Sequence, residues 1–126
     1  MSEKVKIAID VMGGDNAPDK ILDGINLFIN RNKKTIDYFF YLFGDETKIK
    51  DKIKKYTFIN NNYKIFDTKI VVSNELSALS SIKKGKDSSM WKAIQSQIDL
   101  STDVTLSAGN TGVLLVMSKM ILKTLT

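Results

Sequence analysis

Two glycine-centred turns constrain the fold of this chain more than any other feature. The first covers residues 9–18, around Gly13 and Gly14, and the second covers residues 106–112, around Gly109 and Gly112. Each turn follows an apolar run with the composition of a buried strand and precedes a run with helical spacing. In an α/β fold, such strand-to-helix turns present backbone N–H groups to anionic ligands. The two turns therefore predict an active site.

The rest of the chain alternates between strand-like and helix-like runs. We expect strands over residues 5–11, 38–43, 70–72 and 103–106, and a loop over 60–62. We expect helices to begin at Pro18, at residue 46 (ending at 56), after residues 73–75, at Ser88 and Ser89, and at about Gly112. This alternation predicts the α/β class, with a parallel sheet and helices on both faces.

The apolar residues of the first and last helices differ in distribution. In the first helix they fall on one face, which indicates a single buried side; they are Ile21, Leu22, Ile25, Phe28 and Ile29. From Val113 to Leu125 the apolar residues cover most of the helix circumference. We therefore expect other parts of a protein to pack around this helix. With 126 residues, we expect one α/β domain over 1–126, either the amino-terminal part of a longer enzyme or a chain that pairs with another subunit.

Composition excludes several kinds of chemistry. Hydrophobic residues make up 43% and charged residues 26%, as in ordinary globular proteins. The chain has neither cysteine nor histidine, which rules out disulfides, thiolate or histidine metal sites and serine–histidine hydrolysis within it. Any chemistry therefore relies on positioning, backbone donors, hydroxyls, amides, lysines and carboxylates, and we expect no metal or other cofactor.

The formal net charge of +5 suits an acidic partner, such as a carrier protein or an anionic membrane surface. The lysines are interleaved with acidic and apolar residues, which favours solvated helix faces over nucleic-acid binding. The first residues run straight into a strand without a signal core, and no apolar run is long enough to span a bilayer. We expect a cytoplasmic protein that does not bind nucleic acid.

Each glycine turn has a functional and a structural interpretation. Gly13 and Gly14 allow the backbone to pass close to a ligand, and Asp15 or Asn16 can cap the next helix, but such a sequence is often only a turn. In the second turn, Asn110 and Thr111 can donate to a carbonyl or phosphoryl oxygen, or can cap the last helix. Neither turn is a Gly-x-x-x-x-Gly-Lys-Ser/Thr phosphate loop or a dinucleotide fingerprint.

Two further features lie close to these turns. Lys83, Lys84 and Lys86 precede the helix start at residues 88–89, which suits a dianionic phosphate but also suits a solvated lysine run. Asp10 ends the first strand. We interpret Asp10 as a residue that ties down the glycine turn, in preference to an acid–base catalyst.

Four blocks carry a family resemblance: residues 7–18, 38–45, 83–94 and 107–112. With these blocks in order, the chain resembles the phosphate acyltransferase family called PlsX over nearly its whole length. The resemblance implies a cytoplasmic, dimeric enzyme that transfers a fatty acyl group from acyl carrier protein to inorganic phosphate. The product would be acyl-phosphate for phospholipid synthesis. It also implies a fold similar to isocitrate and isopropylmalate dehydrogenases and to phosphate acetyltransferases.

The chain departs from the family in two ways. Lys83 and Lys86 stand where the family commonly has arginine or lysine, so positive charge is kept without a bidentate grip. Family members are also considerably longer, and the part that would complete the sheet, the dimer pocket and the acyl site is missing here. The resemblance leaves peripheral membrane contact open, and the positive charge allows it.

The resemblance implies a set of roles for the site. Phosphate is an anionic nucleophile near neutral pH, so attack on a thioester needs orientation and oxyanion stabilisation without histidine. The hypothesis gives catalysis to Asn110, Thr111 and Lys86. It gives substrate and phosphate binding to Gly13, Gly14, Asp15, Asn16, Ser88, Ser89, Ser107, Gly109 and Gly112.

Two alternatives remain from the sequence. The first is a non-catalytic module of the same fold that binds a phosphate ligand. The second is a dehydrogenase-like lobe, which the missing nucleotide fingerprint disfavours.

Overall fold

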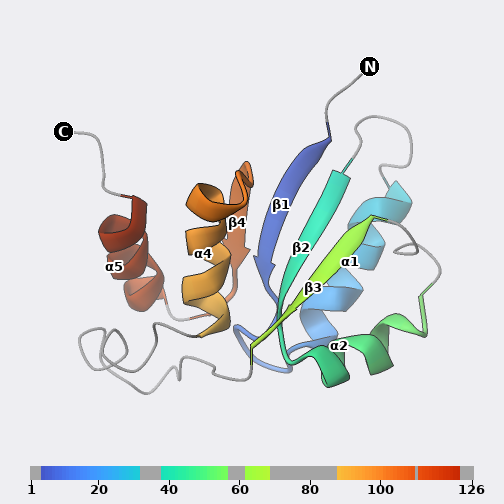
Figure 1. The fold of residues 1–126 in the computed structure, drawn as a ribbon. Coiled ribbons are helices and arrows are strands. Elements are labelled where there is room, and N and C mark those ends of the chain that lie inside the picture. The colour runs from blue at the N-terminus through green and yellow to red at the C-terminus, as the bar shows by residue number, and fades with distance from the viewer. Residues whose placement is uncertain (1–3, 32–37, 57–61, 69–87, 110, 123–126) are drawn as a thin grey trace.

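The computed structural model describes residues 4–31, 38–56, 62–68, 88–109 and 111–122. Its elements follow in the order β1 (Val5–Asp10), α1 (Asp19–Arg31), β2 (Tyr38–Gly44), α2 (Glu46–Ile53), β3 (Tyr63–Asp67), α4 (Ser89–Asp99), β4 (Val104–Ser107) and α5 (Thr111–Leu122). Figure 1 shows the helices packed around one sheet. None of the helices in these ranges is long and apolar enough to cross a bilayer.

The strands form one parallel sheet in the order β3-β2-β1-β4. β1 lies between β2 and β4, and its last residue, Asp10, is in register with Phe43 on one side and Ser107 on the other. Strands that are distant in the chain, β1 and β4, therefore end side by side. This arrangement brings the two glycine turns to the same edge of the sheet.

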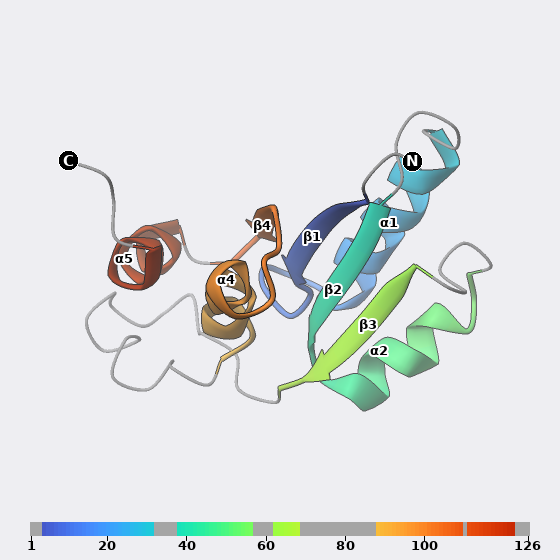
Figure 2. The ribbon, with the colours of Figure 1, turned by 45° about the horizontal axis from the view of Figure 1, so that its top comes forward.

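Helices cover both faces of the sheet, which confirms the predicted α/β class. On one face, Leu22 and Ile25 of α1 and Ile49 of α2 pack against Ile9 and Leu42 of the strands. On the other face, α4 packs against the sheet through Ala93. α5 lies beside α4, and its Val113, Met117 and Ile121 pack against Met90 and Ile94 (Figure 2).

The predicted boundaries were close for most of the described elements, and one strand was missed. Val11 lies in the turn after β1 instead of in the strand, and α2 ends at Ile53 instead of at residue 56. The last strand, β4, and the last helix, α5, each begin one residue away from the predicted position. β3, at Tyr63–Asp67, was not predicted, because its side chains are only half-buried or exposed and two of its five residues are charged. The predicted strand over 70–72 and the helical stretch after 73–75 lie outside the described residues.

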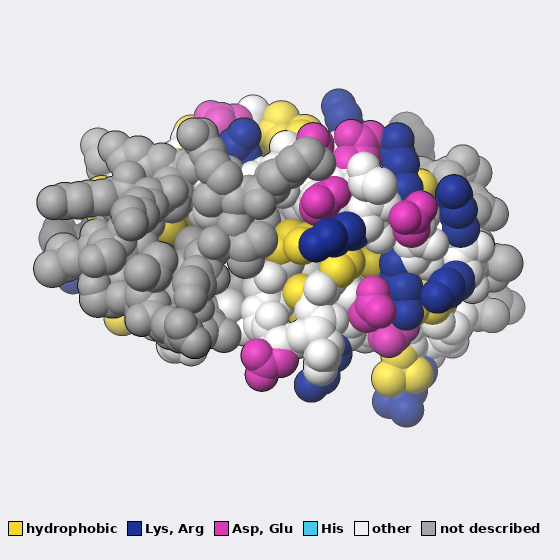
Figure 3. Space-filling view, turned by 90° about the horizontal axis from the view of Figure 1, so that it is seen from below, with side chains coloured by type: hydrophobic (Ala, Val, Ile, Leu, Met, Phe, Trp, Pro, Cys, Tyr) yellow, Lys and Arg dark blue, Asp and Glu magenta, His cyan; other side chains and the backbone are white. Residues whose placement is uncertain are grey.

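Most lysines of α2 confirm the expected solvated helix face, whereas the Lys52 side chain is 17% exposed and its Nζ lies 3.6 Å from Asp19 Oδ2 of α1. Lys50 Nζ lies 2.7 Å from Glu46 Oε1, one turn earlier, and Lys54 Nζ lies 3.9 Å from Asp51 Oδ1. Seen from below, on the side of the sheet's carboxyl edge, basic and acidic side chains are interspersed over the part of the surface away from the grey residues (Figure 3). Exposed pairs of this kind add little stability, on the order of 0–1 kcal/mol each.

The core beneath α1 provides the first test. Leu22 is fully buried, and Leu27 on the same helix is 52% exposed. We expect Leu22→Ala to lower the free energy of unfolding by about 2–5 kcal/mol, because it leaves a cavity in the core. The matched Leu27→Ala should change it by less than about 0.5 kcal/mol. Urea denaturation of both variants measures the difference, and equal effects would contradict the assigned packing.

Candidate active site

The candidate site lies where β1 and β4 end, at the carboxyl edge of the sheet. In parallel α/β proteins, ligands bind at this edge, where strand-to-helix turns expose their backbone. The turn after β1 leads into α1, the turn after β4 leads into α5, and α4 begins at the same edge. Helix amino-terminal ends carry partial positive charge and free N–H groups, which attract anions.

The carboxylate of Asp10 joins three segments at this edge. Its Oδ1 accepts a 2.5 Å hydrogen bond from Ser89 Oγ at the start of α4, and its Oδ2 accepts a 2.8 Å hydrogen bond from Ser107 Oγ at the end of β4. Oδ1 also accepts from the backbone N–H of Met12, at 3.2 Å. Asp10 therefore holds its own turn, as predicted, and also fixes the positions of two distant segments.

Burial has the largest effect on the pKa of this carboxyl. Asp10 is 1% exposed, and this burial raises the pKa of Asp10 above its ordinary value of 3.8. The hydrogen bonds from Ser89, Ser107 and the backbone N–H groups of Met12 and Gly13 oppose that rise in pKa. A buried carboxyl whose oxygens already accept from several donors is suited to holding structure.

The two glycine turns touch each other. A Cβ placed on Gly13 would lie 2.7 Å from Asp10 Oδ2 and 2.8 Å from the backbone nitrogen of Gly109. Gly14 has a φ of +82°, and a Cβ there would lie 2.9 Å from the carbonyl oxygen of Ala108. Only glycine fits these positions, because the backbone of one turn occupies the space where a side chain of the other would stand.

The serines at the start of α4 confirm the predicted helix start. Ser88 is the N-cap, and its Oγ accepts a 3.1 Å hydrogen bond from the backbone N–H of Trp91. Ser89 uses its hydroxyl on Asp10. Both side chains are buried, so their hydroxyl groups stabilise the fold. The predicted role of this helix start in anion binding therefore rests on its backbone N–H groups.

The second turn is held in a similar way. Ser107 Oγ, which donates to Asp10, also accepts a 3.1 Å hydrogen bond from the backbone N–H of Gly109. Thr111 and Gly112 form the exposed first turn of α5 directly afterwards. Their placement at a helix start agrees with the predicted position and leaves their binding role a prediction.

The structure thus brings most of the predicted site residues to one edge. Those clustered around Asp10 are Gly13, Gly14, Ser88, Ser89, Ser107 and Gly109. Asp15 and Asn16 lie on the exposed part of the first turn, and Asn16 has a φ of 60°. Asn110, Lys86 and the neighbouring Lys83 and Lys84 lie outside the described residues.

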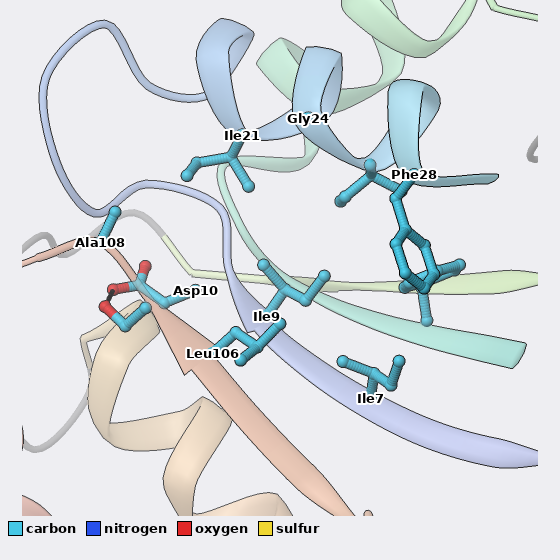
Figure 4. Close-up of a pocket in the computed structure, with 11 residues that line it drawn as sticks. Ile7, Ile9, Asp10, Ile21, Gly24, Phe28, Leu106 and Ala108 are labelled. Carbon is cyan, nitrogen blue, oxygen red and sulfur yellow. Dashed lines mark hydrogen bonds between the residues drawn. The ribbon is translucent and has the colours of Figure 1, made fainter. Parts of the chain in front are cut away.

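An apolar cavity beside the site was not predicted. It measures about 400 Å³ and lies between α1 and the strands β1 and β4. Figure 4 shows Asp10 and Ala108 at one end and Ile7 and Phe28 at the other. No local sequence signal could have shown it, because its walls come from residues of four separate elements and the second turn.

The fold and this edge define a class: a parallel α/β protein with a polar site built from two glycine turns. Comparison with known proteins gives the family. The sequence model described as fatty acid synthesis protein matches residues 5–126, and the chain belongs to this family. This assignment confirms the resemblance drawn from the four sequence blocks.

Curated relatives agree with the family. The chain is 46% identical over 123 residues to the phosphate acyltransferase of Pelagibacter ubique, covering 98% of this chain and 35% of that protein. It is 37% identical over 126 residues to the phosphate acyltransferase of Azorhizobium caulinodans, covering 99% of this chain and 35% of that protein. The chain therefore spans about a third of the length of these relatives.

Gly14 gives a test of the contact between the turns. We expect Gly14→Ala to lower the free energy of unfolding by about 1–3 kcal/mol, because the methyl group meets the Ala108 carbonyl at a positive φ. Gly24, inside α1, has open space around it. Gly24→Ala should instead raise that free energy by about 0.5–1 kcal/mol. Thermal denaturation compares the two, and a stabilising Gly14→Ala would contradict the contact.

Asp10 gives a test of the buried carboxyl. Because the pKa of Asp10 in the folded state lies above the ordinary 3.8, the folded state binds the carboxyl proton more tightly than the unfolded state does. The resulting stability is present below pH 3.8 and is lost as pH rises through the folded pKa. The unfolding free energy of the wild type minus that of Asp10→Asn should therefore fall with pH across this window. Urea denaturation over a pH series measures it, and a difference that grows with pH would contradict a raised pKa.

Proposed function

We propose that this chain forms part of a phosphate acyltransferase that moves a fatty acyl group from acyl carrier protein to inorganic phosphate. The observation that carries the proposal is the contact between two glycine turns at the carboxyl edge, beside the starts of α4 and α5. The names of the relatives support the reaction class. The proposal further specifies acyl carrier protein as the donor, acyl-phosphate as the product and phospholipid synthesis as its use.

The proposed step is a displacement at a thioester. A phosphate oxygen attacks the carbonyl carbon, a C–O bond forms, and the carbonyl oxygen gains negative charge. The C–S bond then breaks as the carbonyl re-forms, and the carrier thiolate leaves and takes up a proton from water. The products are acyl-phosphate and the free carrier thiol. Such a step depends on positioning and on donors aimed at the developing charge, which agrees with a chain that lacks cysteine and histidine.

The residues that the sequence assigned to the site take distinct roles in the proposal. Backbone groups of Gly13 and Gly14 and the start of α4 bind phosphate. Lys86 neutralises its charge, and Asn110 with Thr111 polarises the thioester carbonyl or holds phosphate. Asp10 keeps the turns in contact and takes no part in proton transfer.

The remaining elements of the proposal concern the whole protein. An acidic carrier protein would be drawn to a chain with a net charge of +5. The family resemblance implies a cytoplasmic homodimer, and the positive charge allows peripheral membrane contact.

A phosphate-binding module without catalysis is the second candidate. It rests on the same contact between the two glycine turns, which needs no residue from outside this chain. Such a module would bind phosphate at the same edge and release no carrier thiol.

The test measures phosphate-dependent release of free thiol from acyl carrier protein loaded with a fatty acyl group. It uses the chain alone and the chain joined at its carboxyl end to the remaining part of the Pelagibacter ubique relative, which we call the joined protein. We expect release by the joined protein. Release by neither protein would reject acyl transfer and leave the binding module.

Variants of the joined protein test the second turn. We expect Asn110→Ala and Thr111→Val each to reduce kcat by about 10²–10³-fold if they remove a donor to the developing oxyanion. Thr47→Val is the matched control, since Thr47 is exposed in the first turn of α2, away from the site. It should leave kcat unchanged. An unchanged rate in Asn110→Ala would withdraw the role given to that residue.

A further inference from the structure

The apolar cavity has a floor made by three neighbouring strands. Ile7 and Ile9 are two residues apart on β1, so their side chains point to the same face of the sheet. Ile7 is in register with Phe40 of β2, and Ile9 is in register with Leu106 of β4. All four residues line the cavity, which therefore has a continuous apolar floor (Figure 4).

The roof of the cavity is one face of α1, and a residue in the middle of this face has no side chain. Ile21, Gly24, Ile25 and Phe28 line the cavity and recur at helical spacing. A Cβ placed on Gly24 would meet nothing within 4 Å, so no close contact requires glycine there. Glycine inside a helix lowers stability relative to alanine. Gly24 therefore leaves room in the cavity wall at a cost to the helix.

The two ends of the cavity differ in chemistry. One end is formed by Asp10, Ser107 and Ala108, and among the described residues that line the cavity only Asp10 and Ser107 have polar side chains. Ala108 belongs to the contact between the two glycine turns. At the other end, the ring of Phe28 packs edge-on against Tyr38, with 5.0 Å between the ring centroids. The cavity thus runs from the candidate active site into apolar surroundings (Figure 4).

We propose that this cavity binds the hydrocarbon chain of a fatty acyl group. The thioester carbonyl lies at the glycine turns, and the acyl chain runs past Gly24 towards Phe28. Gly24 then determines how long an acyl chain the cavity admits. This assignment rests on the proposed function and locates its acyl substrate within this chain, whereas the family resemblance implied an acyl site in the missing part.

A fatty acyl group matches the cavity better than other small ligands do. It has one polar end and an apolar remainder, and the described walls show the same division. Phosphates and nucleotides lose hydrogen bonds to water that these apolar side chains cannot replace. Water itself needs several polar partners, and apolar cavities stay dry. The volume of about 400 Å³ lies within the range of small-molecule sites, roughly 300–1,000 Å³.

Gly24 provides the test, because a larger side chain there narrows the cavity. Gly24→Leu and Gly24→Phe are made in the joined protein. Leu27→Phe is the matched control, since Leu27 lies on the same helix, is 52% exposed and is not among the residues that line the cavity. Thiol release is measured with palmitoyl and with butyryl carrier protein. A fluorescence titration with cis-parinaric acid, a fatty acid, measures binding without catalysis.

The expected result is a loss of preference for the long acyl chain. Each methylene group kept out of an apolar site weakens binding by about fourfold. Both Gly24 variants should therefore lower the ratio of kcat/KM for palmitoyl to that for butyryl carrier protein by at least about tenfold. They should weaken the binding of cis-parinaric acid by a similar factor. Leu27→Phe should change neither quantity.

The outcomes separate this inference from the proposed function. Thiol release with an unchanged ratio in both Gly24 variants would overturn the inference while supporting acyl transfer. A joined protein that does not bind cis-parinaric acid would also overturn it. A joined protein that binds this fatty acid, loses the binding in the Gly24 variants and releases no thiol would support the fatty acyl site while rejecting acyl transfer.

Discussion

The buried carboxylate of Asp10 is the interaction on which the arrangement of the site depends. Its partners Ser89 and Ser107 lie 79 and 97 residues further along the chain, and both donate their hydroxyls to it. Burial disfavours the charge, and the surrounding donors offset part of the lost solvation, so the pKa of Asp10 stays raised. Without this carboxylate, the end of β4, the start of α4 and the first turn would have no common anchor.

The close packing at this anchor explains why glycines surround it. Gly13 and Gly14 approach the backbone of residues 108–109 so closely that a Cβ would meet it within 3 Å. The contact places both glycine turns beside the starts of α4 and α5, and helix amino-terminal ends attract anions. The same packing that stabilises the fold therefore produces the candidate site, and the proposed chemistry needs no histidine or cysteine.

Features set by local sequence could be predicted, and those set by distant contacts could not. The turn after β1, the start of α1 and the Ser88 cap follow from neighbouring residues. The residues of β3 have no strong strand pattern of their own. β3 forms because it pairs with β2. The link from Asp10 to Ser89 and the cavity beside α1 arise only when separate elements meet, so no window of sequence contains them.

The most direct test of this account is a phosphate titration of the ¹⁵N-labelled chain followed by NMR. The account predicts saturable shifts of the backbone amides of Gly13, Gly14 and Gly109, which chloride at equal ionic strength does not produce. Shifts confined to the solvated lysines of α2, or no shift beyond that seen with chloride, would contradict the claim that the two glycine turns form an anion site.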